Sequence, residues 1–126
     1  MASNIGKFGG SMSDLSQEKC VPCRHGDDAL TNAEIQSLMP SLPGWTVWKE
    51  NELPKLMKQF KFKKYADALN FTVQVGNAAD EQDHHPVIVL EWGKVTVYWW
   101  THAINGLHRN DFIMAAATDR LYNAAQ

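Results

Sequence analysis

The stretch HHPVIVLEWGKVTVYWWTH, residues 84–102, determines how the rest of the chain can fold. Two runs rich in β-branched and aromatic residues flank Gly93-Lys94, and this arrangement, with glycine first, predicts a hairpin with a type II′ turn. Counting outward from that turn places His85 opposite His102. Directly opposed residues have Cβ atoms roughly 4.5–5.5 Å apart. The hairpin therefore predicts that two distant histidines share one small site, with His84 beside them.

Alternation of side chains separates the two faces of this hairpin. One face is wholly apolar and is predicted to be core: Ile88, Leu90, Trp92, Val95, Val97 and Trp99. The other face mixes polar and apolar residues and is interpreted as lined by a ligand or covered by a partner: His85, Val87, Val89, Glu91, Thr96, Tyr98, Trp100 and His102. The same register pairs Ile88 with Trp99.

The elements before the hairpin follow from capping and periodicity. Thr31-Asn32-Ala33-Glu34 is a capping box and predicts a helix over 32–39. Alternating residues predict strands at 45–48 and 56–62. Residues 63–81 have helical periodicity, and the stripe predicted to be buried is Tyr65, Leu69, Val73, Gly76 and Ala79 or Asp80. Phe71 and Val75 lie off that stripe, so either the helix is buried on two sides or part of it meets another subunit.

After the hairpin, 103–107 is predicted to be a loop and 109–122 the last helix. The order α-β-β-α-β-β-α predicts an α+β fold, with a four-stranded antiparallel sheet and about three helices packed on one face. The chain is divided into a flexible N-terminal arm, 1–28, and one domain, 29–126.

Composition excludes several classes of function. A net charge of −2 gives no electrostatic basis for direct binding of nucleic acid. The sequence has no apolar run of the roughly 18–20 residues that a membrane span needs, which predicts a cytoplasmic protein. Targeting to an organelle by the N-terminal arm stays open.

Cys20 and Cys23 form an isolated CxxC motif ahead of Arg24-His25. A structural zinc site wants four ligands, and only His25 is near; a redox pair wants a surrounding strand and helix that the sequence does not suggest. The pair is interpreted as structural, with metal and redox roles left open.

The motif Asp80-x3-His84-His85-Pro86-x5-Trp92-x9-His102-x8-Asp111 resembles that of the pterin-4a-carbinolamine dehydratase family. The resemblance covers roughly residues 30 to 122. It implies an α+β fold, a homo-oligomer (dimer or tetramer), and dehydration of 4a-hydroxytetrahydrobiopterin to quinonoid dihydrobiopterin. The substrate is then a pterin, and no metal or organic cofactor is implied. The implied catalytic residues are His84, His85 and His102, which line the pterin site with Asp83, Trp100 and Thr101.

Loss of hydroxide from a ring carbon needs a general acid and a base, and histidine suits both roles near neutral pH, each contributing ~10²–10⁴-fold. On the family pattern His84 and His102 are alternative general acids, while His85 binds substrate and assists as base. Asp80 lies one helical turn before His84 and is predicted to support an imidazole, a role that Glu81 could take instead. Asp111 is predicted to hold the last helix and the loop that carries His102.

Several of these residues also have other interpretations. Adjacent histidines on an extended chain point to opposite sides, which disfavours a metal site of three histidines. Trp100 could stack on a flat ligand or lie in an oligomer interface. His108 stands where the family often has a Ser or Thr cap, so the last helix could begin at Asn110 instead.

A non-enzymatic alternative comes from the same resemblance. Relatives in the family serve as dimerisation cofactors of homeodomain transcription factors and as Rubisco assembly factors, so a binding module with a protein partner stays open. The retained histidines favour the enzyme.

Overall fold

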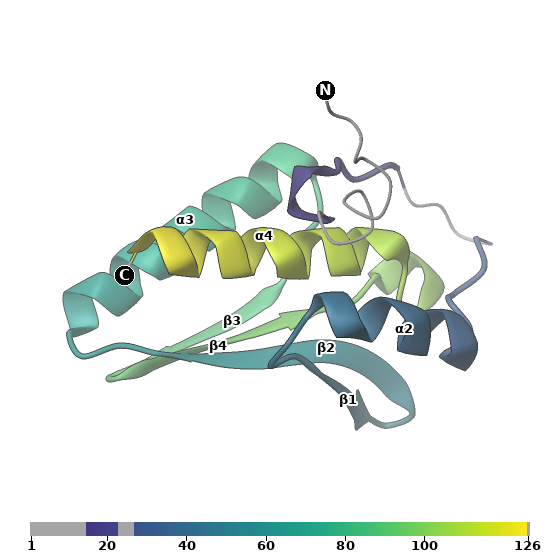
Figure 1. The fold of residues 1–126 in the computed structure, drawn as a ribbon, viewed down its shortest axis with the longest axis horizontal. Helices are drawn as coiled ribbons and strands as arrows, with labels where there is room; N and C mark the ends of the chain where they lie inside the picture. Colours follow the sequence, from purple (N-terminus) through teal and green to yellow (C-terminus); the bar gives the residue numbers. More distant parts are fainter. Residues whose placement is uncertain (1–14, 23–26, 126) are drawn as a thin grey trace.

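Residues 15–22 and 27–125 are described by a computed structural model, and they form one sheet covered on one face by helices (Figure 1). The α-helices are α2 (Asn32–Leu38), α3 (Tyr65–Gln82) and α4 (Arg109–Ala125). The strands are β1 (Thr46–Glu50), β2 (Leu53–Lys61), β3 (Val87–Glu91) and β4 (Lys94–Trp99), and short 3-10 turns are η1 (Leu15–Gln17), η2 (Met39–Ser41) and η3 (His102–Ile104). The predicted α+β class and element order are confirmed.

The four antiparallel strands lie in the order β1-β2-β4-β3. β1 and β2 are joined by Asn51 and Glu52, whose φ values of 53° and 69° are both left-handed. Two left-handed residues in a two-residue connection are the mark of a type I′ turn, whose twist matches that of the flanking strands. The capping box at Thr31 also forms, since its hydroxyl accepts the Glu34 N–H while the Glu34 carboxylate accepts the Thr31 N–H.

The predicted register of the second hairpin is wrong by two residues. Ile88 pairs with Val97 rather than Trp99, and the ladder closes at Glu91 opposite Lys94, so the turn consists of Trp92 and Gly93. Gly93, with φ of 88°, is the second turn residue, whereas a type II′ turn needs the left-handed residue first. The observed register sets opposite charges across from each other, with 3.8 Å between Lys94 Nζ and Glu91 Oε2.

Trp92 consequently leaves the predicted core face and is 79% exposed. The rest of that face is correctly assigned, because Val95, Val97 and Trp99 are fully buried. They pack with Phe60 of β2 and residues from α3 and α4 in one hydrophobic core. Burial of each such side chain stabilises the fold by about 1.5–3 kcal/mol.

The predicted buried stripe of α3 is also wrong. The face that packs on the sheet and α4 is formed by Ala68, Phe71, Val75 and Ala79, whereas Tyr65, Leu69 and Val73 are exposed. The small alanines, which carry little weight in a search for large apolar residues, let the helix approach its neighbours closely. Neither α3 nor any other helix in the described ranges is long and apolar enough to cross a membrane.

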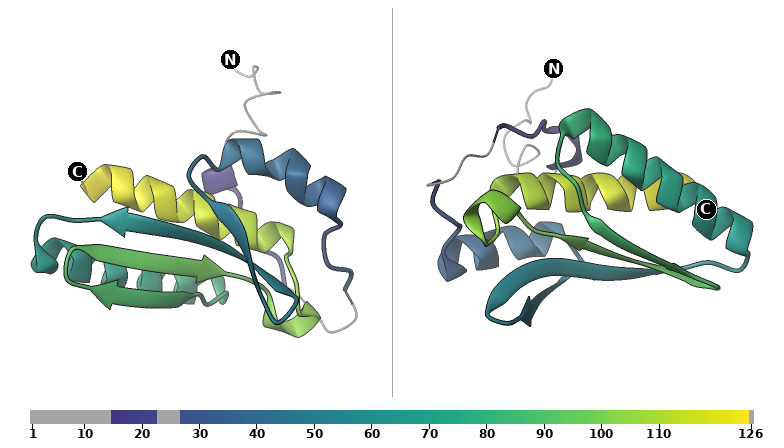
Figure 2. Two further views of the ribbon diagram at one scale, coloured as in Figure 1. Left: turned by 90° about the horizontal axis from the view of Figure 1, so that it is seen from below. Right: turned by 180° about the vertical axis from the view of Figure 1, so that it is seen from behind.

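Residues 15–22, here called the strap, lie against α4 (Figure 2). Leu15 is buried in the main core, at 1% exposure. Farther along, Nε and Nη2 of Arg109 donate to the two carboxylate oxygens of Glu18, at 2.9 and 2.7 Å. The division of the chain at residue 28 stays a prediction, but the described part of the predicted arm packs on the domain. Cys23 and His25 of the predicted arm lie outside the described residues.

Candidate active site

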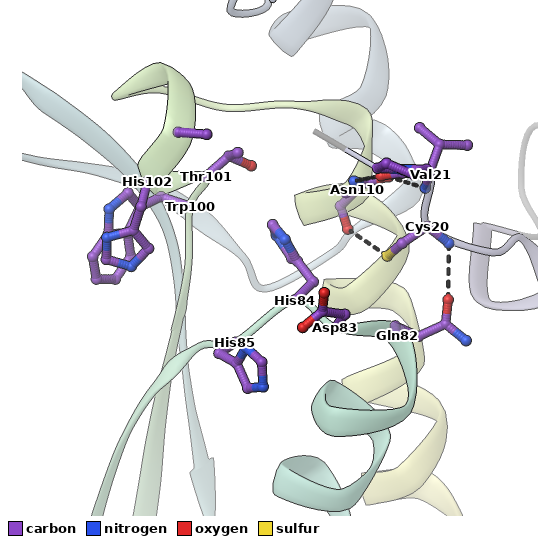
Figure 3. Close-up of a pocket in the computed structure, with 12 residues that line it drawn as sticks. Cys20, Val21, Gln82, Asp83, His84, His85, Trp100, Thr101, His102 and Asn110 are labelled. Carbon is purple, nitrogen blue, oxygen red and sulfur yellow. Dashed lines mark hydrogen bonds between the residues drawn. The ribbon is translucent and has the colours of Figure 1, made fainter. Parts of the chain in front are cut away.

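A pocket of about 400 Å³ opens where the C-terminal end of α3, the segment after β4 and the first turn of α4 meet (Figure 3). The strap closes a further side. The pocket is lined by Cys20, Val21, Pro22, Gln82, Asp83, His84, His85, Trp100, Thr101, His102, Ala103 and Asn110. All the predicted catalytic and substrate-binding residues therefore lie on one pocket, and their functional roles stay predictions.

The end of α3 fixes where the first two histidines emerge. Asp83 has a left-handed φ of 52° and terminates the helix. The His84 N–H then donates to Ala79 O at 3.1 Å, and the Asp83 N–H donates to Asp80 O at 3.2 Å. This pair of bonds is the Schellman arrangement that satisfies the last helix carbonyls. It turns the chain sharply, so His84 points inward and Pro86 begins the approach to β3.

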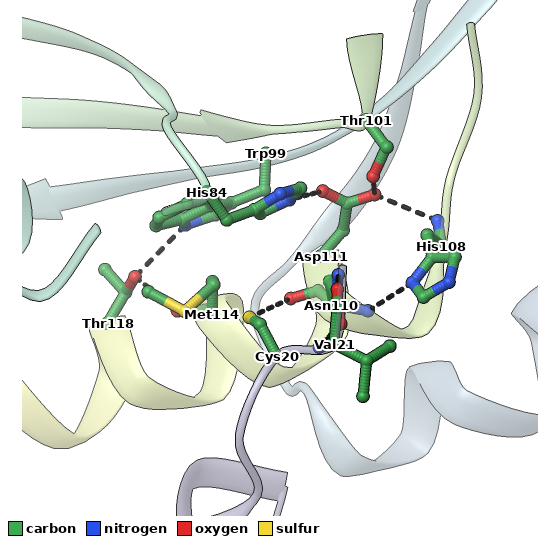
Figure 4. Close-up of polar contacts among 10 residues, drawn as sticks. All are labelled: Cys20, Val21, His84, Trp99, Thr101, His108, Asn110, Asp111, Met114 and Thr118. Carbon is green, nitrogen blue, oxygen red and sulfur yellow. Dashed lines mark hydrogen bonds and ion pairs between the residues drawn. The ribbon is translucent and has the colours of Figure 1, made fainter. Parts of the chain in front are cut away.

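Asp111 is the centre of the polar network beneath the pocket (Figure 4). Its carboxylate is fully buried. Oδ1 lies 2.6 Å from His84 Nε2, while Oδ2 accepts the Thr101 hydroxyl at 2.8 Å and the His108 N–H at 2.9 Å. These bonds offset the cost of burying a charge. Asp111 was predicted to hold the loop that carries His102, and it contacts that loop through Thr101. Its bond to His84 was not predicted from the sequence.

The same network orients the His84 ring. A carboxylate only accepts hydrogen bonds, so Nε2 must carry a hydrogen, and Nδ1 is the nitrogen left for a ligand. The ring also lies parallel to the buried Trp99 indole, with 5° between the planes and 5.8 Å between the centroids. Trp99 is itself fixed, since its Nε1–H donates to Thr118 Oγ1 at 3.1 Å. His84 is therefore held in one orientation from two sides.

His85 lies in a different environment, because its side chain is 58% exposed. Its Nε2 is 3.4 Å from Asp80 Oδ1, and that carboxylate is 85% exposed. The prediction that Asp80 would reach an imidazole holds for His85 and not for His84, whose partner is Asp111. Adjacent residues leave the backbone on opposite sides, so a helix-borne acid that reaches one histidine misses the other. An exposed pair at this distance orients His85 only weakly.

His102 is exposed at the start of η3, immediately after the buried Thr101. A bridge between Thr101 and Gly106 closes the loop that follows β4. The His102 ring lies 4.4 Å from the centroid of Trp100, and Lys55 Nζ lies 4.2 Å from the same indole. Trp100 is therefore packed between a cation and an imidazole at the edge of the pocket.

The predicted face-to-face pairing of His85 with His102 is wrong, because it rested on the incorrect turn. Extending the observed register beyond the ladder brings His85 level with Trp100 after two residues, and His84 level with Thr101 after three. Instead, His85 contacts Asp80 and His102 contacts Trp100. The histidines still line one pocket, but as three separately supported groups.

The sequence analysis missed the contribution of the strap and of Asn110 to the pocket wall. Asn110 is 2% exposed and hydrogen-bonds the backbone of Val21, while the Cys20 N–H donates to Gln82 Oε1 at 2.9 Å. These contacts join residues 62 and 89 positions apart. The CxxC motif was the signal that marked this segment, although its meaning was not evident from spacing.

His108 caps α4 with its ring. Its Nδ1 accepts the Asn110 N–H at 3.0 Å, and its own N–H donates to Asp111. The two bonds are the equivalent of a capping box, with an imidazole in place of a hydroxyl. The helix accordingly begins at Arg109, and the alternative start at Asn110 is wrong.

Two side chains at the contact between the strap and α4 have shifted pKa values. Burial, assisted by the charge of Asp111, raises the pKa of the Cys20 thiol to about 11. The hydrogen bonds to Glu18 raise the pKa of Arg109 above its usual value. Cys20 is thus kept as a neutral thiol, with Sγ 3.9 Å from Asn110 O.

Across residues 15–22 and 27–125, no three His, Cys, Asp or Glu side chains are grouped so as to hold a metal ion.

Comparison with known proteins agrees with the resemblance read from the motif. The family model for pterin 4 alpha carbinolamine dehydratase matches residues 28–121. A Microcystis aeruginosa protein provisionally named as a pterin-4-alpha-carbinolamine dehydratase is 47% identical over 111 residues, 88% of this chain and 96% of that protein. A Marinobacter nauticus protein with the same provisional name is 48% identical over 111 residues, 88% of this chain and 100% of that one.

One solved structure is also similar to this chain. It is described as a transcriptional coactivator/pterin dehydratase from Brucella melitensis. It superposes with a TM-score of 0.68 at 30% identity, over 75% of this chain and 98% of that one.

Proposed function

Because the chain belongs to the pterin 4 alpha carbinolamine dehydratase family, we propose that it dehydrates 4a-hydroxytetrahydrobiopterin to quinonoid dihydrobiopterin and water, as part of tetrahydrobiopterin recycling. The observation that carries the proposal is the gathering of His84, His85 and His102 on one pocket. A pocket of about 400 Å³ is of the size that small-molecule ligands occupy.

The reaction needs two proton transfers. The bond between C4a and the hydroxyl oxygen breaks, and a general acid protonates the departing oxygen to give water. The neighbouring ring nitrogen loses its proton to a base, and a double bond forms between this nitrogen and C4a. An imidazole serves either role near neutral pH.

We assign His84 and His102 as alternative general acids and His85 as the group that binds substrate and assists as base. His84 is the best held of the three, because Nε2 is bound to Asp111 and Nδ1 is left to exchange a proton with the ligand. His102 lies at the exposed edge beside Trp100, from which it would reach the ligand from another direction. Asp83, Trp100 and Thr101 complete the proposed binding surface, with Asp80 and Asp111 as supports.

The proposal is tested by stopped-flow measurement of 4a-hydroxytetrahydrobiopterin dehydration. His84→Ala and His102→Ala are each expected to lower kcat by ~10²-fold or more, because each removes a proton-transfer group. Gln74→Ala, an exposed change on α3, is the matched control and should leave the rate unchanged. Equal rates for the wild-type chain and both histidine variants would refute the enzymatic assignment.

We also propose that the chain forms a homo-oligomer. The exposed apolar stripe on α3 (Tyr65, Leu69 and Val73) and the exposed Val87 and Val89 on edge strand β3 are surfaces that a second copy would bury. Light scattering after size exclusion tests this, with Leu69→Asp expected to lower the mass and Gln74→Ala expected to leave it unchanged. A monomeric wild-type chain would refute it.

The apolar stripe on α3 is also the surface that a different protein would use. The name of the Brucella melitensis structure joins coactivator and dehydratase, so a protein partner is the second candidate function for this chain. If the wild-type chain is monomeric and does not dehydrate the pterin, the binding module becomes the favoured function.

A further inference from the structure

The strap crosses one side of the pocket and is fastened to the domain both before that crossing and at the crossing itself. Before the pocket, Leu15 is buried in the core and Glu18 forms a two-bond ion pair with Arg109. At the pocket, the strap lies between Gln82 at the end of α3 and Asn110 in the first turn of α4. These two helix ends also position His84 and Asp111.

Asn110 holds the strap with a matched pair of hydrogen bonds. Its Oδ1 accepts the Val21 N–H at 3.0 Å, and its Nδ2–H donates to Val21 O at 2.6 Å (Figure 3). Both backbone groups of Val21 are therefore satisfied by one side chain, as they would be in a strand pair. The Cys20 N–H is satisfied by Gln82 in the same way. The polar groups that the strap carries here are turned toward the helices.

The surface that the strap offers to the pocket is consequently apolar. Val21 is 57% exposed, Pro22 is exposed, and both belong to the lining of the pocket on which the histidines lie. Ligand sites combine a few placed polar groups with a larger apolar lining. Here the histidines and Asp83 supply the polar groups, and Trp100 supplies apolar surface elsewhere on the pocket.

We propose that Val21 and Pro22 contact the bound pterin and that Asn110 is the positioning residue that holds them there. This inference rests on the proposed function. It adds a binding wall that lies outside residues 28–121, the segment matched by the family model.

The size of the expected effect follows from the exposure of Val21. Burying a valine side chain fully is equivalent to roughly a 12- to 160-fold change in affinity, and burying the exposed half gives roughly 4- to 20-fold. The contact is made in both the ground state and the transition state. Its loss should therefore raise KM and leave kcat unchanged.

The test uses the full chain, with fluorescence titration of 7,8-dihydrobiopterin and steady-state dehydration kinetics. Val21→Ser is expected to weaken pterin binding and raise KM by roughly 4- to 20-fold. Val21→Leu, which keeps an apolar side chain, should leave the pterin affinity and KM within about two-fold of the wild-type values. Asn110→Ala should raise KM in the same way. Because Asn110 is buried and its loss could unfold α4, Glu18→Gln provides a second release of the strap that touches neither the pocket nor the core. Glu91→Gln, which breaks a surface pair far from the pocket, is the matched control.

Unchanged pterin affinity in Val21→Ser would overturn the inference. So would a fall in kcat that Val21→Leu does not rescue, because that result indicates only a structural role. If His84→Ala and His102→Ala lose activity while the KM of Val21→Ser equals that of the wild-type chain, the inference fails and the proposed function stands. If the wild-type chain does not dehydrate the substrate, both fail.

Discussion

Replacing Asp111 by asparagine should separate the structural role of the buried network from its chemical role. The introduced amide can keep every bond, because its oxygen can take the place of Oδ2 and accept from Thr101 and the His108 N–H. Its NH₂ group then takes the place of Oδ1 and faces His84. Since an NH₂ group only donates, His84 Nε2 must become an acceptor, and the ring hydrogen moves to Nδ1.

This change of tautomer should stop His84 from cycling between its two protonation states. In the wild-type chain Nε2–H stays bound to the carboxylate while Nδ1 gains or loses a proton. In Asp111→Asn a protonated ring would set two donors against each other at a separation of about 2.6 Å. We expect kcat to fall by ~10²–10⁴-fold, the usual contribution of a positioned acid or base.

Stability should change much less. Exchanging charge-assisted bonds for neutral ones costs about 1–2 kcal/mol. For 126 residues, about 4 °C of Tm corresponds to each kcal/mol, so Tm should fall by about 4–8 °C. Asp111→Ala instead leaves the three donors without an acceptor, and its cost of about 3–5 kcal/mol should lower Tm by about 12–20 °C. Glu81→Gln makes the same chemical change at an exposed position and serves as the control.

The assays are stopped-flow dehydration, thermal unfolding, and ¹⁵N NMR of the His84 ring, which distinguishes the two tautomers. A rate for Asp111→Asn within about three-fold of the wild-type chain would refute the acid role of His84. A ring that keeps its hydrogen on Nε2 in the variant would refute the tautomer argument, whatever the rate.

Three further predictions concern the fold around the site. Gly93→Ala should lower the free energy of unfolding by about 1–2 kcal/mol because φ is 88° there, whereas Gly76→Ala, with open space around its Cβ, should raise it by about 0.5–1 kcal/mol; urea titration measures both. His108→Ala should cost about 0.5–1 kcal/mol by loss of the α4 cap, and His108→Ser should recover that loss, again by urea titration. The raised pKa of Cys20, about 11 against 9.0, means that the folded chain keeps the thiol proton more tightly than the unfolded chain. The contribution of the Cys20 thiol to the free energy of unfolding is therefore fully present below about pH 9 and is lost as the pH rises toward 11. Tm should fall more steeply over that range in the wild-type chain than in Cys20→Ala, and parallel falls would contradict the assignment.

Local sequence signals predicted the elements because their causes are local. The hydroxyl and carboxylate of the Thr31–Glu34 capping box act within one helical turn, and alternation in the hairpin reports the core face directly. The buried face of α3 could not be predicted in this way. Ala68 and Ala79 are buried against α4 and the sheet, where only a small side chain has room. The room available at these positions depends on where α4 and the sheet lie, which the sequence of α3 alone does not give.

The contacts that build the pocket were harder to predict for a different reason. Asn110 and Val21 are 89 residues apart, and the backbone of a short polar segment gives no periodic signal of its partner. Asp111 was identified through the motif, but its bond to His84 depends on the path of α4 beneath the end of α3. Such contacts follow from tertiary structure and have no counterpart in spacing along the chain.

The incorrect hairpin register nevertheless left the site residues on one pocket, and the reason is geometric. Side chains in a strand repeat every two residues, so an error of two moves each partner along the strand without moving it to the other face. An error of one would have exchanged the core and pocket faces. What brings the histidines together is therefore the left-handed turn at Asp83 and the bonds from Asp111 to His84 and Thr101. Because Asp111 bonds directly to two residues that line the pocket, substitutions at Asp111 should affect the site more than substitutions at the hairpin turn.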